Sequence, residues 1–320
     1  MSEFKIRMGC DLQFQKNVII LHYSDLRPMN SPSDTYTALR RKNYGLVQGT
    51  ALCLAVISAG AALQTALGDV DWGLLSRPWN IILLAMYLIG IGGLYALCRK
   101  RQWISNLTSY GTAIPAIASA VVVTVVLGLT EQNHHGRHFW NRMLSFWPFV
   151  MSYLWMTTIL GLTCVKHIFA YRRPRPCFLL NHLGLFIVLV CSALGSADVS
   201  TLTLSARPGQ AEWQALDGEN KVVNLPFSIR PNGRSEEPED GYPNPAVGIT
   251  IESQSRSEQT VSVNHPASID GWDIYLTGFS DETGNVEFTL ISDPWLPAVY
   301  CGLFMMVAGA LCMMFTRQQR

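Results

Sequence analysis

The sequence predicts a polytopic α-helical membrane protein, with six transmembrane helices and an extracytoplasmic all-β domain between the fifth and the sixth. Charged residues make up only 15% of the 320 residues, whereas soluble domains carry roughly a quarter. The deficit falls in long uncharged runs, while the stretch 198–293 is strongly acidic. This composition excludes a soluble enzyme, a disordered chain and a nucleic-acid binder that uses a basic patch.

Six apolar stretches are long enough to cross a hydrocarbon core about 30 Å thick, which takes about 20 helical residues. None contains Asp, Glu or Arg. The one lysine, Lys166, lies near a helix end, from which its ammonium group can reach the membrane surface. The first 43 residues are polar, so we expect a cytoplasmic leader without a secretory signal. The predicted spans are 45–67, 79–98, 111–129, 146–170, 178–197 and 295–315.

Lysine and arginine in short loops predict the orientation, because positively charged loops stay on the cytoplasmic side. Basic clusters lie before the first span, after the second, after the fourth and after the sixth. The alternate loops, 69–78 and 130–145, hold three basic residues between them. We therefore expect both termini in the cytoplasm and residues 198–293 outside. The clusters are Arg40, Arg41 and Lys42; Arg99, Lys100 and Arg101; Arg172, Arg173 and Arg175; Arg317 and Arg320.

The segment 198–293 alternates apolar and polar residues between turn signals, which is typical of β strands. It contains sixteen acidic and five basic residues and no cysteine. The lack of cysteine here and of any C-x-x-C motif argues against a thiol oxidoreductase and a zinc ribbon. Residues 231–245, with four prolines, are expected to form an exposed loop. The predicted strands of a small antiparallel sandwich or sheet are 202–205, 225–229, 247–251, 260–263, 272–276 and 286–290.

Histidines in the spans are the candidate functional residues, since ionisable side chains within a membrane are costly and mark function by default. His182 lies about four residues into the fifth predicted span. A neutral imidazole there can ligate haem iron, or it can hydrogen-bond to a neighbouring helix. His167 lies near the end of the fourth span, beside Lys166, and is expected at the membrane interface.

Other histidines carry weaker signals. His134, His135 and His138 lie in the outer loop, where they form either an interfacial belt with the neighbouring aromatic residues or a contact with a haem edge. His265 is expected in a turn, and His22 lies in the leader. No nucleophile motif or phosphate-binding loop is present, so no catalytic residue is assigned.

From about residue 110 onward, the chain resembles the ResB (CcsB) family of System II cytochrome c maturation. Seven short pieces occur in the family's order. The chain departs from the family's plan in residues 1–109, which are additional, and at Leu276 and Trp295, where glutamine and glycine are common. The matching pieces are 127–132; Phe146, Trp147 and Cys164; 182–185; 225–227; 263–266; 271–275; and Asp293 with Pro294.

The resemblance implies a multi-pass protein of the bacterial inner membrane that handles haem b in transit. It would work with a CcsA/ResC-type partner that carries a tryptophan-rich segment. Together they would present haem to the C-x-x-C-H motif of apocytochrome c. The resemblance implies that His182 is an axial haem ligand opposite a partner histidine. Thioether formation would belong to the holocytochrome c synthase complex, with this chain a non-catalytic subunit.

These inferences divide the chain into five parts. Residues 1–43 form the leader, 44–109 two extra helices with a cytoplasmic loop, and 110–197 a three-helix ResB-like core. Residues 198–293 form the β domain, and 294–320 the last helix and tail.

Two other functional classes remain open. A transporter or quinone-linked protein with its own haem site could use His167 and His182 together, because they lie on different helices. A receptor or scaffold without a cofactor would leave His182 unexplained.

Overall fold

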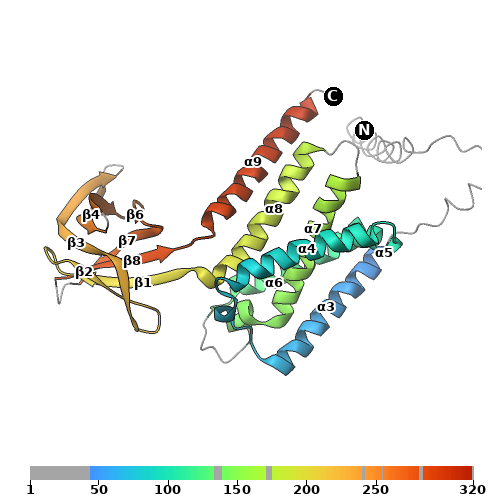
Figure 1. Ribbon diagram of the computed structural model, residues 1–320, viewed down its shortest axis with the longest axis horizontal. Coiled ribbons are helices and arrows are strands. Elements are labelled where there is room, and N and C mark those ends of the chain that lie inside the picture. Colours follow the sequence, from blue (N-terminus) through green and yellow to red (C-terminus); the bar gives the residue numbers. More distant parts are fainter. Residues whose placement is uncertain are drawn as a thin grey trace, which may run out of the picture. The chain divides into compact units, whose positions relative to one another are not determined.

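The computed structural model describes residues 44–132, 139–170, 175–239, 242–253, 255–280 and 284–318. Within these ranges, six helices are long and apolar enough to cross a membrane, which confirms the predicted polytopic membrane protein. Figure 1 shows these helices and the β sheet inserted between the last two. The helices are α3 (Leu46–Leu67), α4 (Trp79–Cys98), α6 (Tyr110–Leu129), α7 (Trp147–Ala170), α8 (Pro176–Gly195) and α9 (Leu296–Gln318).

Shorter helices connect the long ones. The helix α5 (Gln102–Leu107) follows α4, in a segment predicted as a loop. Short 3-10 helices lie at η1 (Trp72–Leu75), η2 (Phe139–Ser145) and η3 (Ser196–Asp198). The leader 1–43 and the loop histidines His134, His135 and His138 lie outside the described residues, so these predictions are not tested.

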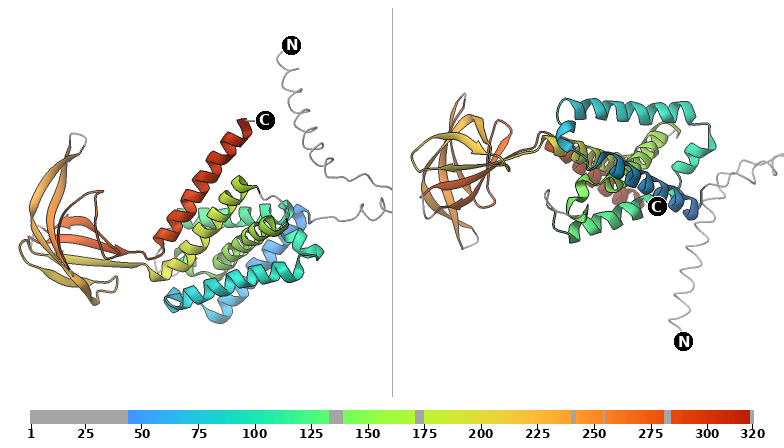
Figure 2. Two further views of the ribbon diagram at one scale, coloured as in Figure 1. Left: turned by 45° about the horizontal axis from the view of Figure 1, so that its top comes forward. Right: turned by 90° about the horizontal axis from the view of Figure 1, so that it is seen from below.

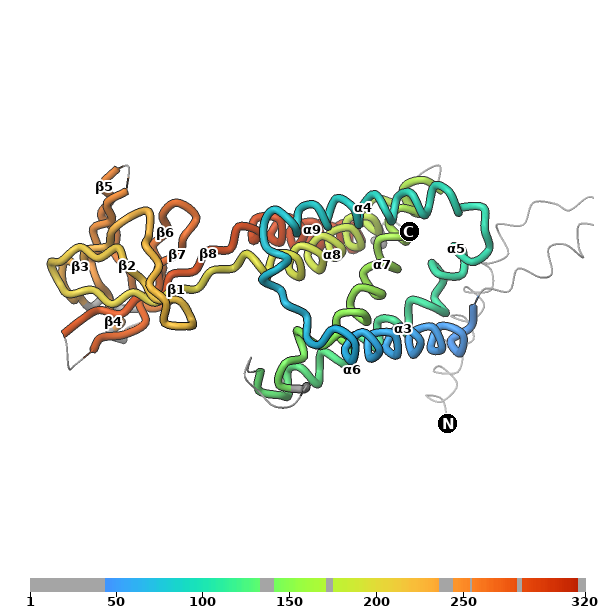
Figure 3. Tube along the Cα trace, turned by 60° about the horizontal axis from the view of Figure 1, so that its bottom comes forward, coloured from blue at the N-terminus to red at the C-terminus, as the bar shows by residue number. Residues whose placement is uncertain are grey.

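The long helices pack through two clusters of buried apolar residues. On α3, Cys53 is buried with Ala116 of α6 and Ile159 of α7, and Figure 3 shows α7 running obliquely from beside α3 and α6 toward α8. A second cluster joins α4, α7 and α8 around Ile91, Leu162 and Phe186. The helix α9 packs against α8, and the two lie side by side in both views of Figure 2.

One antiparallel sheet of eight strands follows α8, in the order β5-β4-β3-β2-β1-β8-β7-β6. This confirms the predicted β structure between the fifth and sixth long helices, and residues 200–292 are called the sheet domain below. The sheet curls so that its edges approach: the Gln259 side chain of β5 donates to the Ser268 carbonyl oxygen of β6, at 3.4 Å. The strands are β1 (Ser200–Ala206), β2 (Glu212–Leu216), β3 (Val222–Glu239), β4 (Tyr242–Glu252), β5 (Arg256–Ser262), β6 (Ala267–Ile269), β7 (Trp272–Phe279) and β8 (Val286–Ser292).

The inner face of the curl buries one apolar core, to which alternate residues of the strands contribute. In β8, Val286, Phe288 and Leu290 are buried, whereas the residues between them are partly exposed. In β1, Leu202, Leu204 and Ala206 follow the same alternation. The period-two pattern of the sequence is thus the pattern of burial.

The prediction of an exposed loop at residues 231–245 is wrong. Residues 231–239 continue β3 and pair with β4, with Pro238 opposite Pro243. These prolines lie beyond the last pairing of β2 with β3 and of β5 with β4, so each has only one neighbouring strand. A missing N–H is tolerated there, since it can face the open side of the hairpin.

Candidate functional site

His182 lies near the start of α8, where the helix emerges from the α7–α8 connection. Arg175 adopts extended backbone angles as the N-cap, and Pro176 begins the helix, as proline favours because its missing N–H is not needed there. His182 follows Pro176 by six residues, which places it about 9 Å along the axis at 1.5 Å per residue. It therefore lies somewhat further from the start of its helix than the sequence alone indicates.

The tautomer of His182 follows from its contact with the preceding turn. Its Nδ1 lies 3.0 Å from the carbonyl oxygen of Phe178. Because a carbonyl oxygen can only accept, Nδ1 carries the proton, and the neutral ring then presents the lone pair of Nε2. The side chain is half-buried. This arrangement suits a metal ligand, since such histidines commonly hold their second nitrogen on a carbonyl.

Phe178 brings His182 and His167 to one cluster. The ring centroid of Phe178 lies 3.7 Å from that of His182 and 4.3 Å from that of His167. His167 is buried. Its Nε2 accepts a hydrogen bond from the Arg175 backbone N–H, at 3.1 Å. That bond fixes the start of α8 against the end of α7. The two histidines that the sequence singled out are therefore neighbours in the structure. His182 donates a hydrogen bond through Nδ1, whereas His167 accepts one through Nε2.

The opposite side of α8 packs closely against α9. A Cβ atom on Gly184 would lie 2.6 Å from the Gly302 carbonyl oxygen, and one on Gly302 would lie 2.7 Å from that of Gly184. Residues two apart on a helix point to nearly opposite sides. Gly184 thus lets α9 approach, while His182 faces away from it. This gives the His-Leu-Gly-Leu piece at 182–185 a physical basis.

A disulfide between Cys177 and Cys312 joins α8 to α9 at the same end, with their Cα atoms 5.4 Å apart. Nothing in the sequence indicated this pairing, because 135 residues separate the two cysteines. Nearby, Lys166 reaches out of α7 and donates to the Thr108 hydroxyl oxygen, at 2.8 Å. The helix carrying His182 is therefore tied to α9 by the disulfide and to α7 by the hydrogen bond from Arg175 to His167.

The other candidate histidine within the described residues, His265, has a turn role. Its backbone exchanges two hydrogen bonds with Ser262, at 3.1 and 3.2 Å, and Asn264 between them has a positive φ of 70°. Within the described residues, no three His, Cys, Asp or Glu side chains gather as a metal site.

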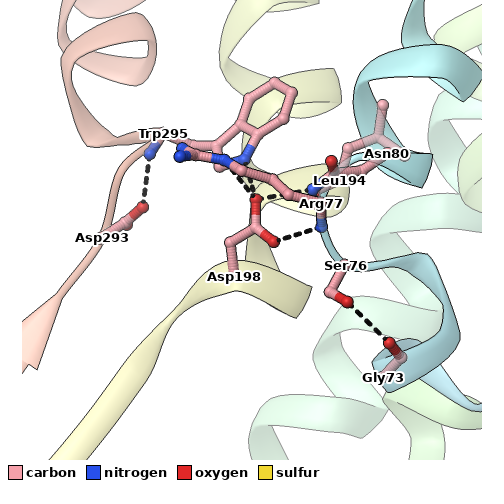
Figure 4. A network of polar contacts seen from close by, with 8 residues as sticks. All are labelled: Gly73, Ser76, Arg77, Asn80, Leu194, Asp198, Asp293 and Trp295. Carbon is pink, nitrogen blue, oxygen red and sulfur yellow. Dashed lines mark hydrogen bonds and ion pairs between the residues drawn. The ribbon is translucent and has the colours of Figure 1, made fainter.

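Sequence reasoning missed a polar cluster at the opposite end of α8. Asp198 accepts hydrogen bonds from Arg77, Asn80 and Trp295, which come from two distant parts of the chain (Figure 4). The available signals were a lone acid directly after an apolar span and a lone arginine in the loop 69–78. Neither signal identifies the other as its partner.

The fold and these contacts define a polytopic membrane protein in which a histidine-bearing helix leads into a curled β sheet. Residues 172–292 match the model of the ResB-like family, which confirms the predicted resemblance over α8 and all eight strands. The pieces of sequence before residue 172, and Asp293 with Pro294, lie outside this match.

A solved structure, cytochrome c heme lyase CcmF, is similar over 74% of this chain with 11% identity and a TM-score of 0.34. The similarity covers 45% of that protein, so the chain spans less than half its length. No curated protein matches the chain.

Proposed function

We propose that this chain acts in cytochrome c maturation as the haem-handling subunit of a System II synthase. The family match supports this role, because it covers both the helix that carries His182 and the complete sheet domain. The observation that carries the proposal is the hydrogen bond from His182 to the Phe178 carbonyl, which leaves Nε2 as the ligating atom.

In this proposal His182 is one axial ligand of haem b in transit, and an imidazole of a CcsA/ResC-type partner is the other. His182 and the partner imidazole would hold the haem through its iron, which binds neutral imidazole nitrogens. The chain's own residues hold and orient the ligand: the Phe178 carbonyl keeps Nδ1 protonated, and the Phe178 ring restricts rotation of the imidazole. Because His182 is only half-buried, a haem bound there could be covered by the partner.

The charges around the start of α8 suit an anionic ligand. Arg175 is exposed at the N-cap, and the N-terminus of a helix carries a partial positive charge. Haem propionates placed toward this end would be stabilised by both. This supports a haem bound with its carboxylates toward the predicted cytoplasmic side.

The alternative of a haem held by His167 and His182 within one chain has weaker support. The Nε2 atom of His167 already accepts from the Arg175 backbone. Ligation through that atom would break the bond that fixes the start of α8. We therefore assign His167 to positioning.

From the predicted topology we infer where each part of the complex lies and which role this chain has in it. The chain lies in the bacterial inner membrane with both termini cytoplasmic, and the sheet domain is extracytoplasmic, where it meets the partner and the C-x-x-C-H motif of apocytochrome c. Thioether formation belongs to the complex, so this chain is a non-catalytic subunit. The five-part division into a leader, two extra helices, a three-helix core, a β domain and a last helix follows the same proposal.

The test is to co-express the full chain with a CcsA/ResC-type partner and to record the haem spectrum of the purified complex. His182→Ala should lower haem content by more than about tenfold, since even the loss of a group that hydrogen-bonds to a metal-ligating histidine costs roughly 10–100-fold in metal affinity. Added imidazole should restore part of it. Cytochrome c yield should fall in parallel.

His167→Ala is the matched control, because it removes the neighbouring imidazole that contacts the same Phe178 ring. It should retain most of the haem. Wild-type haem content in His182→Ala would reject the ligand assignment. Equal losses in both variants, both restored by imidazole, would favour the two-histidine site within one chain.

A further inference from the structure

The carboxylate of Asp198 lies at the point where the sheet domain joins the helices. Its Oδ1 accepts from the Arg77 backbone N–H at 2.9 Å. Its Oδ2 accepts from the Asn80 amide at 2.8 Å and from the Trp295 indole N–H at 2.7 Å, and the Arg77 guanidinium lies 3.1 Å away. Figure 4 shows these groups converging on the one side chain. Both oxygens of a single carboxylate thus accept hydrogen bonds, and Oδ2 receives most of them.

The carboxylate and its donors together come from both connections of the sheet domain and from a third segment. Asp198 ends η3, two residues before β1 begins, and Trp295 lies between β8 and α9. Arg77 and Asn80 lie at the start of α4, after η1. The sheet domain is joined to the rest of the chain by only these two connections, residues 196–199 and 293–295. One carboxylate therefore ties both connections to each other and to the α3–α4 hairpin (residues 46–98).

The centre of the cluster is shielded from water, while the Arg77 side chain at its edge is 50% exposed. The Asp198 side chain is 7% exposed, and Asn80 is fully buried. A buried carboxylate is costly unless it is paired and hydrogen-bonded, and bonds to an ionised acceptor are stronger than neutral ones. The donors around Asp198 meet that requirement. The network is consequently sensitive to loss of any one member.

Close packing reinforces the polar contacts. A Cβ atom on Gly195 would lie 2.6 Å from the Cβ of Trp295, so only glycine lets the indole reach Asp198. The Asn80 amide also donates to the Leu194 carbonyl oxygen at the end of α8, at 3.1 Å. Its two donor bonds fix the amide orientation, and its Oδ1 has no partner within the described residues. Leaving the Oδ1 atom of a buried amide unpaired costs free energy. The two donor bonds of Asn80 offset that cost.

We propose that Asp198 is a positioning residue, and that the α3–α4 hairpin is a brace that holds the base of the sheet domain in one orientation relative to α8 and α9. The hairpin lies outside the segment that matches the ResB-like family, so this gives a role to a part of the chain that the family match does not cover. The inference does not depend on haem binding. It predicts that loss of the Asp198 contacts leaves the sheet folded but free to reorient.

The test is a distance measurement on the full chain in lipid nanodiscs by double electron–electron resonance. Spin labels carried by genetically encoded residues replace Glu258, which is exposed on β5, and Leu129, which is exposed at the end of α6. The unmodified network should give a single narrow distance peak. Asp198→Asn should lose that peak and give a broad distribution, because the amide loses the charge and half of the acceptor capacity.

Trp295→Phe and Asn80→Ala each remove a smaller part of the network and should broaden the peak to a lesser degree. Trp295→Phe keeps an aromatic ring beside Gly195 and removes the indole N–H. The matched control is Asp69→Asn, which makes the same substitution within the loop of the α3–α4 hairpin, at an acid whose ion pair is with Arg142, and which should leave the peak narrow.

An unchanged narrow peak in Asp198→Asn would overturn the proposal. Should that variant fail to fold, unchanged peaks in both Trp295→Phe and Asn80→Ala would overturn it equally. Because the readout is a distance, failure of the brace and failure of haem ligation by His182 are measured independently.

Discussion

At the scale of single residues, the Phe178 position performs two tasks. Its carbonyl oxygen sets the tautomer of His182, and its ring contacts both imidazoles. The carbonyl belongs to the backbone and survives any side-chain substitution. The two tasks can therefore be separated experimentally.

Phe178→Leu should weaken haem retention without abolishing it. The variant keeps the Nδ1 hydrogen bond but loses the ring contacts, which are worth about 0.5–1.5 kcal/mol for an aromatic pair. Haem retention should fall by roughly twofold to tenfold, measured as haem per protein after a dilution series of the purified complex. The loss should be smaller than that in His182→Ala.

Phe149→Leu is the control for that change, since Phe149 stacks on Tyr153 near the other end of α7. It removes a comparable aromatic contact away from His182 and should leave haem retention unchanged. Equal haem loss in the two leucine variants would mean that the Phe178 ring has no particular role at the site.

At the scale of elements, α8 and α9 form a closely packed pair. The contact between Gly184 and Gly302 allows the two backbones to approach, as small residues do in membrane helix interfaces. The disulfide between Cys177 and Cys312 ties the same pair near one end. The helix α8, which carries His182, precedes the sheet domain in the sequence, and α9 follows it. These contacts therefore hold the two helices that flank the sheet domain against each other.

Gly302→Ala should destabilise this pair. The new methyl group would lie 2.7 Å from the Gly184 carbonyl oxygen and 2.8 Å from a Val188 methyl, so the helices must separate. Overpacking of this kind costs about 1–3 kcal/mol. The Tm of the purified chain in detergent should fall by several degrees.

Gly92→Ala makes the same change in α4, where a Cβ atom would meet nothing within 4 Å. It should be neutral or raise stability slightly, by up to about 1 kcal/mol, because glycine is entropically unfavourable inside a helix. A Tm for Gly302→Ala that equals or exceeds that of Gly92→Ala would contradict the close-packing account.

The long hairpin of β3 and β4 shows where local sequence signals fail. Four prolines and several acids predicted a loop at 231–245, but the prolines are paired on a hairpin with one free side. Local composition shows that prolines do not suit a central strand with a neighbouring strand on each side. It does not show that this part of the hairpin has a neighbouring strand on one side only.

At the scale of the whole membrane domain, the contacts sort the loops into two groups. The loop 69–78 contacts both the second loop, through Val70 and Ser145 at 2.8 Å, and the start of the sheet domain, through Arg77 and Asp198. Lys166 and Thr108 mark the other end of the helices. The grouping agrees with the charge pattern, while the side of the membrane that each group faces remains a prediction.

Epitope tags inserted at Gly218 and at Lys100 will test that prediction. Gly218 lies in the exposed turn between β2 and β3, and Lys100 is exposed after α4; exposed turns tolerate insertions. The positive-inside rule predicts that antibody binds the Gly218 tag on intact spheroplasts and the Lys100 tag only after permeabilisation. The reverse pattern would invert the topology and place His182 near the outer surface.

The sequence by itself determined the six spans, their order, the presence of a β domain and the candidacy of His182. All of these depend on local composition: the length of apolar runs, the period of burial, and an ionisable residue where such residues are costly. The span boundaries agree with the helices to within a few residues.

Only the tertiary structure decided which distant groups meet. Asp198 lies more than 90 residues from Trp295 and more than 110 from Arg77, and Cys177 lies 135 residues from Cys312. Contacts of this kind depend on how helices pack, and packing is chosen by many weak interactions that no single stretch of sequence contains. The hydrogen bond between His182 and Phe178 spans one turn of a single helix, whereas the contact between His167 and Phe178 joins two helices and depends on how they pack.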